Sequence, residues 1–157
     1  LNRGDALELQ QREVSDEKLL YNTDFDSCLD SDGQPISTGN EIAISFPMAG
    51  DFDFMCINTD KSLAPIIMPA DIIALKKYST WEKYIPGDFI CVVVTKEFKV
   101  LRKVSPLQSD EQSITFIQMI DGNPIESKIP KDIILEIYKV VGNYRRQWPD
   151  LPKRDNL

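Results

Sequence analysis

The stretch FICVVVTKEFKVLRKV (residues 89–104) indicates the kind of fold that this chain adopts. Its first half, Phe89 to Thr95, is an almost continuous apolar run rich in valine, which is typical of a buried β-strand. The second half, Lys96 to Val104, follows after almost no gap, as the returning strand of a hairpin would. The sequence therefore predicts two adjacent strands at the centre of the molecule.

Further short strands are predicted on both sides of this hairpin. Each is a short apolar or alternating run bounded by turn residues: 41–46, closed by Pro47, then 52–58, 72–77, 113–120 and 133–141. The turn Asp121-Gly122-Asn123-Pro124 separates the last two. Short strands separated by turn residues, with little of the periodicity of a helix, predict a mainly-β domain, which we assign to residues 41–147.

The two ends of the chain differ from this pattern. Residues 1–40 are interpreted as a linker arm, with short helices over 1–21 and an acidic loop over 22–40. Residues 148–157 are interpreted as a C-terminal tail. Positive charge gathers near this end at Arg145, Arg146, Lys153 and Arg154, either as a solvated tail or as a phosphate-binding patch.

Composition excludes several classes of protein. The 157 residues are 42% hydrophobic and 27% charged, which fits one globular domain. No apolar run approaches the ~18 residues of a transmembrane helix, and there is no secretory leader, so we expect a cytoplasmic protein without a membrane partner. The net charge is −7, so the domain is not expected to grip DNA by itself, because nucleic-acid affinity rests largely on basic side chains.

The reactive residue types restrict the possible chemistry. There is no histidine, which excludes Ser-His-Asp and Cys-His catalysis and every zinc site that needs an imidazole. Cys28, Cys56 and Cys91 show no CxxC spacing, and we interpret Cys56 and Cys91 as small core residues of a reduced protein. The acidic stretch around Gly33 fails the calcium-loop pattern at two ligand positions and is interpreted as a solvated loop. We expect neither a metal nor a cofactor.

One serine lies in an unusual setting, Asp60-Lys61-Ser62-Leu63-Ala64-Pro65, followed by Pro69 and a strand. A serine near a proline usually serves turn chemistry. A turn stiffened by two prolines could also present the Ser62 hydroxyl beside free backbone N–H groups, which is what an oxyanion site requires. Both interpretations remain open from the residues alone.

The order and spacing of several motifs resemble the C-terminal domain of LexA- and UmuD-like repressors, the serine–lysine self-cleaving peptidase family. In the family pattern Gly-Asp-Ser-Met-x-Pro, the serine and proline are matched by Ser62 and Pro65, while Asp60 and Lys61 replace the Gly-Asp. The second Gly-Asp of the family is half matched by Ala70-Asp71. Its hairpin and its Val-Lys-Arg strand correspond to residues 85–95 and 101–104, and its closing strand to 137–142. The resemblance covers about residues 42–146. It implies strongly bent antiparallel sheets and a serine that attacks a peptide bond of its own chain, with a strand lysine as base.

The catalytic motifs are degenerate at the base. Arg102 stands at the lysine position, on the more apolar face of its strand with Phe98, Val100 and Val104. A guanidinium stays protonated at neutral pH and has no acceptor lone pair, so it cannot accept the serine proton. Lys103 could replace it only if a bulge turned the strand by one residue. Lys61 is an alternative base, but side chains of neighbouring residues diverge.

The resemblance therefore implies a peptidase-inactive regulatory and dimerisation domain of a helix-turn-helix transcriptional repressor. DNA would be bound only through an upstream domain outside this chain, and the expected partner is a second copy. The alternative is an active self-cleaving peptidase with Ser62 as nucleophile and Lys103 or Lys61 as base. If the domain is inactive, Arg102→Lys is expected to restore slow cleavage only if a scissile segment still reaches the cleft. Ala49-Gly50 matches the scissile pair of the family but is interpreted as a hairpin turn, and Thr38-Gly39 lies nearer the expected place.

Overall fold

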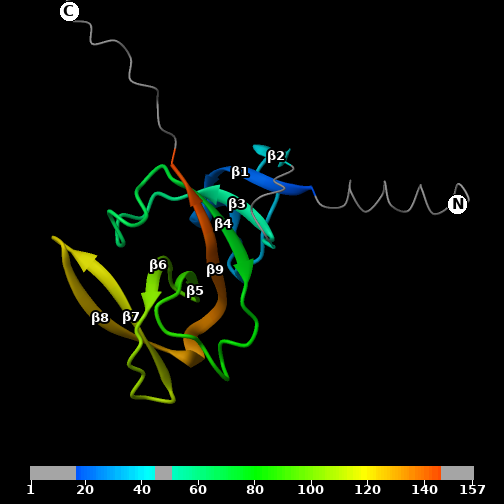
Figure 1. The fold of residues 1–157 in the computed structure, drawn as a ribbon. Coiled ribbons are helices and arrows are strands. Elements are labelled where there is room, and N and C mark those ends of the chain that lie inside the picture. Colours follow the sequence, from blue (N-terminus) through cyan, green and yellow to red (C-terminus); the bar gives the residue numbers. More distant parts are fainter. Residues whose placement is uncertain (1–16, 45–50, 146–157) are drawn as a thin grey trace, which may run out of the picture.

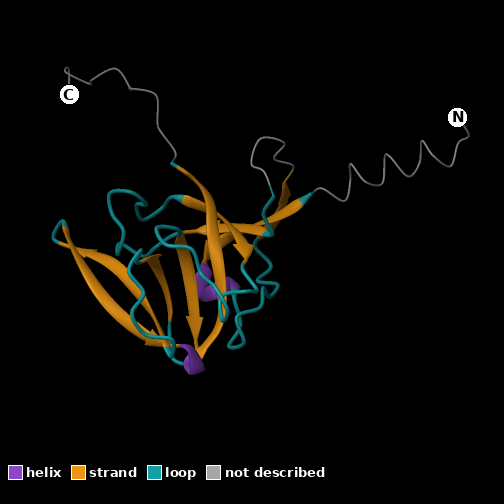
Figure 2. Ribbon diagram, turned by 60° about the horizontal axis from the view of Figure 1, so that its bottom comes forward, coloured by secondary structure: helices purple, strands orange, loops and turns teal. Residues whose placement is uncertain are grey.

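A computed structural model describes residues 17–44 and 51–145 as a mainly-β structure with almost no helix (Figures 1 and 2). The strands are β1 (Lys18–Asp24), β2 (Glu41–Ile44), β3 (Phe54–Ile57), β4 (Ile72–Lys77), β5 (Ile90–Thr95), β6 (Lys99–Val104), β7 (Ser113–Ile120), β8 (Asn123–Pro130) and β9 (Ile134–Tyr144). The helical elements are α2 (Phe25–Cys28) and one 3₁₀ turn, Lys131–Ile133. The mainly-β prediction is confirmed.

The strands form one mixed sheet in the order β2-β1-β3-β4-β9-β5-β6-β7-β8. The β1–β3 pair is parallel, and the other pairs are antiparallel. The expectation of strongly bent antiparallel sheets is therefore wrong, since there is one mixed sheet and it is not strongly curled. The long strand β9 pairs with β4 on one side and with β5 on the other, so it joins the N-terminal and central strands into this single sheet.

Both faces of β5 are buried, which explains its continuous apolar run. Along β5, Val92 and Val94 belong to one core cluster, with Leu101 and Tyr138, whereas Cys91 and Val93 belong to the cluster on the other side. Because alternate side chains point to opposite faces, a strand covered on both sides must be apolar at every position. The buried, unpaired Cys28, Cys56 and Cys91 confirm the core assignment of Cys56 and Cys91.

The predicted central strands are confirmed, with ends that differ by a few residues. In the N-terminal arm, the helical expectation is wrong for residues 18–21, which belong to β1. Leu19 and Leu20 suggested a helical face, but backbone pairing with β2 and β3 holds this segment extended. The rest of that expected helical segment, residues 1–16, lies outside the described residues. The acidic loop also contains α2, which is capped by the side chain of Asp24.

Strand β8 was not predicted, because Asn123-Pro124 was interpreted only as a turn. It pairs with β7 along its whole length, from Ile120 opposite Asn123 to Ser113 opposite Pro130. The connecting residues Asp121 and Gly122 both have positive φ, 52° and 80°, as a two-residue type I′ hairpin requires. This turn sets the register of the eight-residue strand that follows it.

Candidate functional site

Ser62 lies in a compact loop, here named the serine loop, which comprises residues 58–71 between β3 and β4. Its two ends are joined because the Asn58 N–H donates to the Asp71 carbonyl and the Ala70 N–H donates to the Asn58 carbonyl, both at 2.7 Å. The fully buried Asn58 amide also donates to the carbonyls of Asp60, at 2.7 Å, and Met68, at 3.1 Å. The loop therefore has a fixed shape that is set by one side chain at its base.

Two apolar side chains anchor this loop to the sheet. Leu63 and Ile67 are each 1% exposed and belong to the same core cluster as Val92, Val94 and Leu101 of the central hairpin. The sequence thus places a buried leucine directly after Ser62, and this leucine holds the serine against β6.

The structure brings Ser62 and Arg102 into direct contact, although 40 residues separate them. Arg102 Nη1 donates a hydrogen bond to Ser62 Oγ at 2.9 Å. The Ser62 hydroxyl donates to Asp60 Oδ1, and the Ser62 backbone N–H donates to the same oxygen at 2.7 Å. The hydroxyl therefore accepts from a guanidinium and donates to a carboxylate.

The same residues fill a gap in the sheet. Strands β6 and β7 pair only at Lys103–Ile117 and Val104–Phe116, so the earlier part of β6 lacks a β-strand neighbour on this side. There, Asp60 Oδ2 accepts from the Leu101 N–H at 2.9 Å, and Arg102 Nη1 donates to the Leu101 carbonyl at 2.8 Å. On the β7 side, the Met119 N–H donates to the Ser62 carbonyl at 2.6 Å. The serine loop therefore satisfies backbone groups of both diverging strands.

Electrostatics keep Arg102 a cation. Burial lowers the pKa of Arg102 from its ordinary value, and the carboxylate of Asp60, 3.9 Å away, opposes this shift. An arginine side chain is not deprotonated in proteins, so Nη1 remains a donor toward Ser62. Cys91 lies opposite Arg102 in the β5–β6 ladder, and burial raises the pKa of its thiol, which leaves the thiol protonated and neutral.

Neither alternative lysine forms a hydrogen bond with the Ser62 side chain, whose partners are Asp60 and Arg102. The β5–β6 ladder runs from Lys99 to Lys103 without a register shift, so these two strands do not contain the bulge that would turn Lys103. Lys103 Nζ instead lies 3.4 Å from Asp88 Oδ1. Lys61 is exposed to solvent.

Two backbone donors of the serine turn, the N–H groups of Ser62 and Ala64, are already engaged. The N–H of Ser62 bonds to Asp60, as described above, and the N–H of Ala64 donates to the Lys61 carbonyl at 3.2 Å. An oxyanion site needs donors that point at the developing negative charge and are free to bind it. These two N–H groups are committed to the structure of the loop.

A second ion pair, between Arg145 and Asp71, fixes the C-terminal end of the serine loop. The sequence analysis did not predict it. Arg145 Nε and Nη2 donate to the two oxygens of Asp71 at 2.9 and 3.0 Å, and Nη2 also reaches the Pro65 carbonyl at 3.3 Å. The hydrogen bonds from Arg145 lower the pKa of Asp71, whose side chain is only 2% exposed. No local signal links these residues, because Arg145 follows β9 and the sheet topology alone places it beside β4.

The candidate scissile segments have different outcomes. Ala49-Gly50 lies outside the described residues. Thr38-Gly39 precedes β2, and Thr38 donates to Glu41 from its N–H, at 3.1 Å, and from its hydroxyl, at 3.2 Å. Hydrogen bonds lower the pKa of Glu41 to about 2, and the bond from the Ser37 hydroxyl has the largest effect. This segment is therefore a turn held by an ionised carboxylate.

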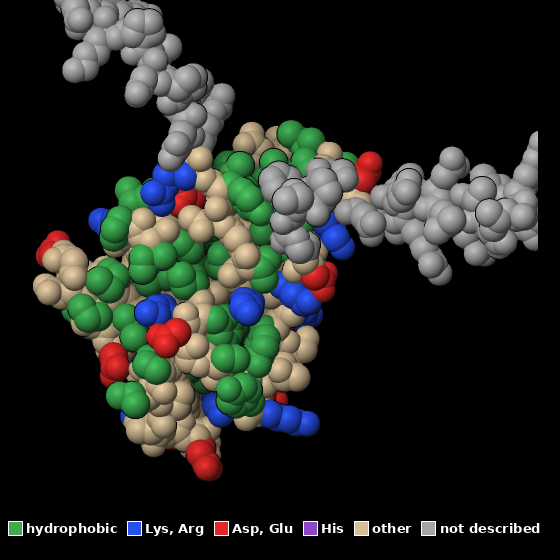
Figure 3. All heavy atoms as spheres, in the orientation of Figure 1, with side chains coloured by type: hydrophobic (Ala, Val, Ile, Leu, Met, Phe, Trp, Pro, Cys, Tyr) green, Lys and Arg blue, Asp and Glu red, His purple; other side chains and the backbone are tan. Residues whose placement is uncertain are grey.

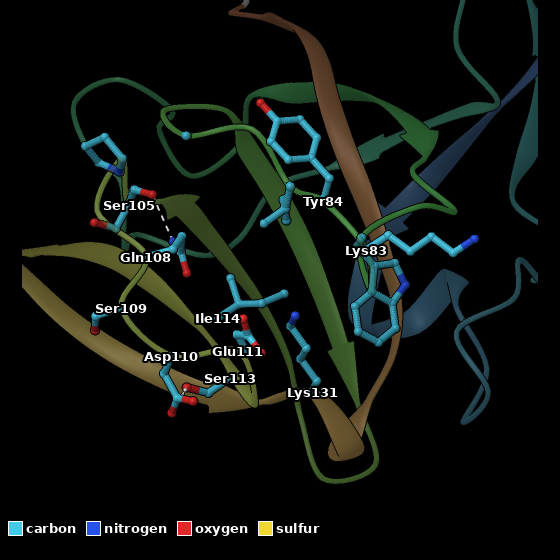
Figure 4. Close-up of a pocket in the computed structure, with 14 residues that line it drawn as sticks. Lys83, Tyr84, Ser105, Gln108, Ser109, Asp110, Glu111, Ser113, Ile114 and Lys131 are labelled. Atoms are coloured by element: carbon cyan, nitrogen blue, oxygen red, sulfur yellow. Dashed lines mark hydrogen bonds between the residues drawn. The ribbon is translucent and has the colours of Figure 1, made fainter.

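A cavity of about 590 Å³ in the described part of the chain lies away from Ser62 (Figure 4). Its walls come from the 81–87 segment, the 105–114 segment and Lys131. Its polar side chains are partly used within the protein, since Gln108 Nε2 donates to the Ser105 carbonyl and the Ser113 hydroxyl donates to Asp110, both at 2.9 Å. The cavity includes none of the residues that surround Ser62.

The face shown in Figure 3 carries basic and acidic side chains scattered among apolar ones. Within the described ranges, no three acidic or cysteine side chains are grouped as metal ligands would be. No helix among those residues has the length and hydropathy to cross a membrane. Comparisons of the chain with protein-family models, with curated proteins and with solved structures gave no match.

Proposed function

We propose that this chain is a regulatory and dimerisation domain of a LexA-like, helix-turn-helix transcriptional repressor, and that it does not cleave itself. One observation carries the proposal: the Arg102 guanidinium donates to Ser62 Oγ at 2.9 Å. The motifs on which the resemblance rests thus lie together in space, and a permanent cation occupies the place of the base.

The hydrogen bonds around Ser62 support an inactive site. A serine nucleophile must lose its proton to a nearby base, and its oxygen must be free to attack. Here the oxygen accepts from Arg102, and the backbone N–H of the serine bonds to Asp60. These interactions hold the serine loop in the gap between strands β6 and β7, so the site keeps a structural role without the reaction.

Overall charge supports a role in assembly rather than in direct DNA contact. A chain with a net charge of −7 is repelled by a phosphate backbone, so DNA binding belongs to another domain of the repressor. A dimerisation domain sets the spacing of the two DNA-binding domains on operator half-sites.

A fusion experiment tests this proposal. The chain is joined behind a monomeric helix-turn-helix domain that represses a reporter only when it is dimerised. We expect repression by the fusion and none by the DNA-binding domain alone, because two linked half-site contacts bind far more tightly than one. A fusion that is expressed and folded but does not repress would contradict the proposal.

A further inference from the structure

Strand β8 ends the sheet on one side, and no other described strand pairs with its outer edge (Figures 1 and 2). Seven of its eight residues are exposed, and only Ile129 is buried. An uncovered strand edge is a template for pairing with another strand, unless the chain blocks it. The sequence of β8 determines which of these applies.

Hydrogen bonding within β7 shows which groups of β8 point outward. The Thr115 N–H donates to Gln108 Oε1, and the Thr115 carbonyl accepts from Ser105, so both groups of Thr115 face away from β8. Thr115 lies opposite Lys128, and opposite residues in an antiparallel pair either exchange both bonds or neither. The backbone groups of Lys128 therefore face outward, and so do those two residues away at Glu126.

The outer edge of β8 has two backbone N–H donors, and a proline without an N–H lies on either side of them. By the same alternation, Pro124 and Pro130 also face outward, and neither has an N–H. Pairing on this edge can therefore use only the N–H groups of Glu126 and Lys128. The prolines limit the ladder to the segment between them.

This segment is complementary to itself in reverse. The sequence Pro124-Ile125-Glu126-Ser127-Lys128-Ile129-Pro130 reads proline, isoleucine, charge, serine, charge, isoleucine, proline from either end, with opposite charges at the mirrored positions. When two copies run antiparallel about Ser127, Glu126 lies opposite Lys128 of the second copy, and Ile125 lies opposite Ile129. The outward N–H and C=O groups of Glu126 and Lys128 are then also opposite one another.

The charges select this register over its neighbours. Sliding one strand by two residues places Glu126 opposite Glu126 of the second copy in one direction, and Lys128 opposite Lys128 in the other. Like charges directly opposite each other destabilise a pair of strands, whereas opposite charges stabilise it. Of these three registers, only the complementary one places an apolar residue opposite Ile125, which is 40% exposed in the single chain.

We propose that two copies of this chain associate through antiparallel pairing of their β8 strands, centred on Ser127, with Glu126 of each copy facing Lys128 of the other. The sheets of the two copies then join into one across a twofold axis. This inference deepens the proposed function and rests on it, since it names the surface that would make the dimer.

Charge reversal tests the interface with the whole chain. Sedimentation equilibrium is measured for the wild type, Glu126→Lys and Lys128→Glu. We expect a wild-type dimer and about a tenfold or greater rise in the dissociation constant for each variant, because every facing pair becomes like-charged. Mixing the two variants restores the dimer as a heterodimer, since one contributes two lysines and the other two glutamates.

Three controls separate this effect from unfolding or general charge. The double variant Glu126→Lys/Lys128→Glu recovers the wild-type dissociation constant, because its charges are complementary again. Glu97→Lys changes an exposed charge in the turn between β5 and β6 and leaves the dimer unchanged. Thermal melting shows that each variant folds, and the N–H groups of Glu126 and Lys128 are protected from hydrogen exchange only in the dimer.

The outcomes distinguish this inference from the proposed function. A dimer that is insensitive to both charge reversals overturns the β8 interface and leaves the function to be tested by the fusion. A monomer at all concentrations overturns the interface and dimerisation together, and shows that the prolines and charges protect the edge instead. A charge-sensitive dimer that also cleaves itself supports the interface and overturns the inactive site.

Discussion

At the scale of single residues, the identity of residue 102 determines what the Ser62 hydroxyl can do. A lysine can lose its charge when it is buried, whereas an arginine cannot, so the same position changes from a possible base into a fixed donor. Arg102 uses that donor capacity toward Ser62 Oγ and the Leu101 carbonyl. A partly buried cation is thus accommodated because it bonds to the backbone of the sheet.

The first prediction concerns cleavage. The wild type and Arg102→Lys, incubated at alkaline pH, yield no fragment that depends on Ser62, as measured by intact-mass spectrometry. The amine would supply a base, but the N–H groups of Ser62 and Ala64 remain bonded within the loop. Ser62→Ala in each background is the control, and a fragment that disappears in it would mean that the site is active.

The second prediction concerns Asp71 and acid. Because Arg145 lowers the pKa of Asp71 below its usual 3.8, the ion pair stabilises the fold above that pH. This contribution is lost as the pH falls through the lower folded-state pKa. Arg145→Met should lower the free energy of unfolding near neutral pH, and the loss should become progressively smaller below about pH 4, where Asp71 takes up a proton.

Urea unfolding across the pH range measures this difference, and Arg145→Lys serves as a graded control that keeps the charge without the paired geometry. An equal cost for Arg145→Met at neutral and acid pH would show that the contact does not depend on the charge of Asp71.

At the scale of elements, the serine loop acts as a substitute for strand pairing. It supplies an acceptor to the Leu101 N–H of β6 and another to the Met119 N–H of β7, where the two strands separate. Its own shape depends on Asn58, whose buried amide bonds to backbone groups at both ends of the loop. Loss of the Asn58 side chain should therefore weaken the hydrogen bonds that the serine loop makes to strands β6 and β7.

The third prediction is that Asn58→Ala destabilises the fold by roughly 2–4 kcal/mol, because it removes several buried hydrogen bonds and leaves their partners unpaired. Chemical denaturation measures the loss. Amide exchange should also become faster at Leu101 and Met119. Asn40→Ala, at an exposed position before β2, is the matched control and should change little. Unchanged exchange at Leu101 would contradict the coupling of loop and sheet.

The elements also show where local pattern is sufficient. The central strands were predictable because their residues are buried on one or both faces and their periodicity is strong. Strand β1 was missed because its sequence, KLLYNTD, carries no clear alternation, and it is extended only because β2 and β3 flank it. Strand β8 was missed because its sequence contains two prolines and two charged residues, which are not typical of a central strand. Such residues are tolerated in β8 because it lies at the edge of the sheet and pairs with a strand on one side only.

At the scale of the whole molecule, one sheet buries all three cysteines in the core. Cys28, Cys56 and Cys91 are unpaired and have no exposed surface. A thiol reacts as its thiolate and must meet the reagent, so buried thiols react only when the fold opens.

The fourth prediction follows from this burial. The native protein shows no fast-reacting thiol toward Ellman's reagent, whereas the protein in denaturant shows all three. The slow native rate should increase in Asn58→Ala in step with its loss of stability. A cysteine that reacts rapidly in the native protein would place it outside the core.

The amino-acid sequence by itself determined the mainly-β class, the apolar central hairpin and the absence of any imidazole, because these depend on local periodicity and on residue identity. It also indicated that Ser62 and Arg102 belong to one site, through the order of their motifs. Only the tertiary structure decided the parallel β1–β3 pair, the Asp71–Arg145 clamp and the gap between β6 and β7 that Asp60 and Ser62 fill. Those features join residues that are distant along the chain, and such contacts form only once the strands have an order in the sheet.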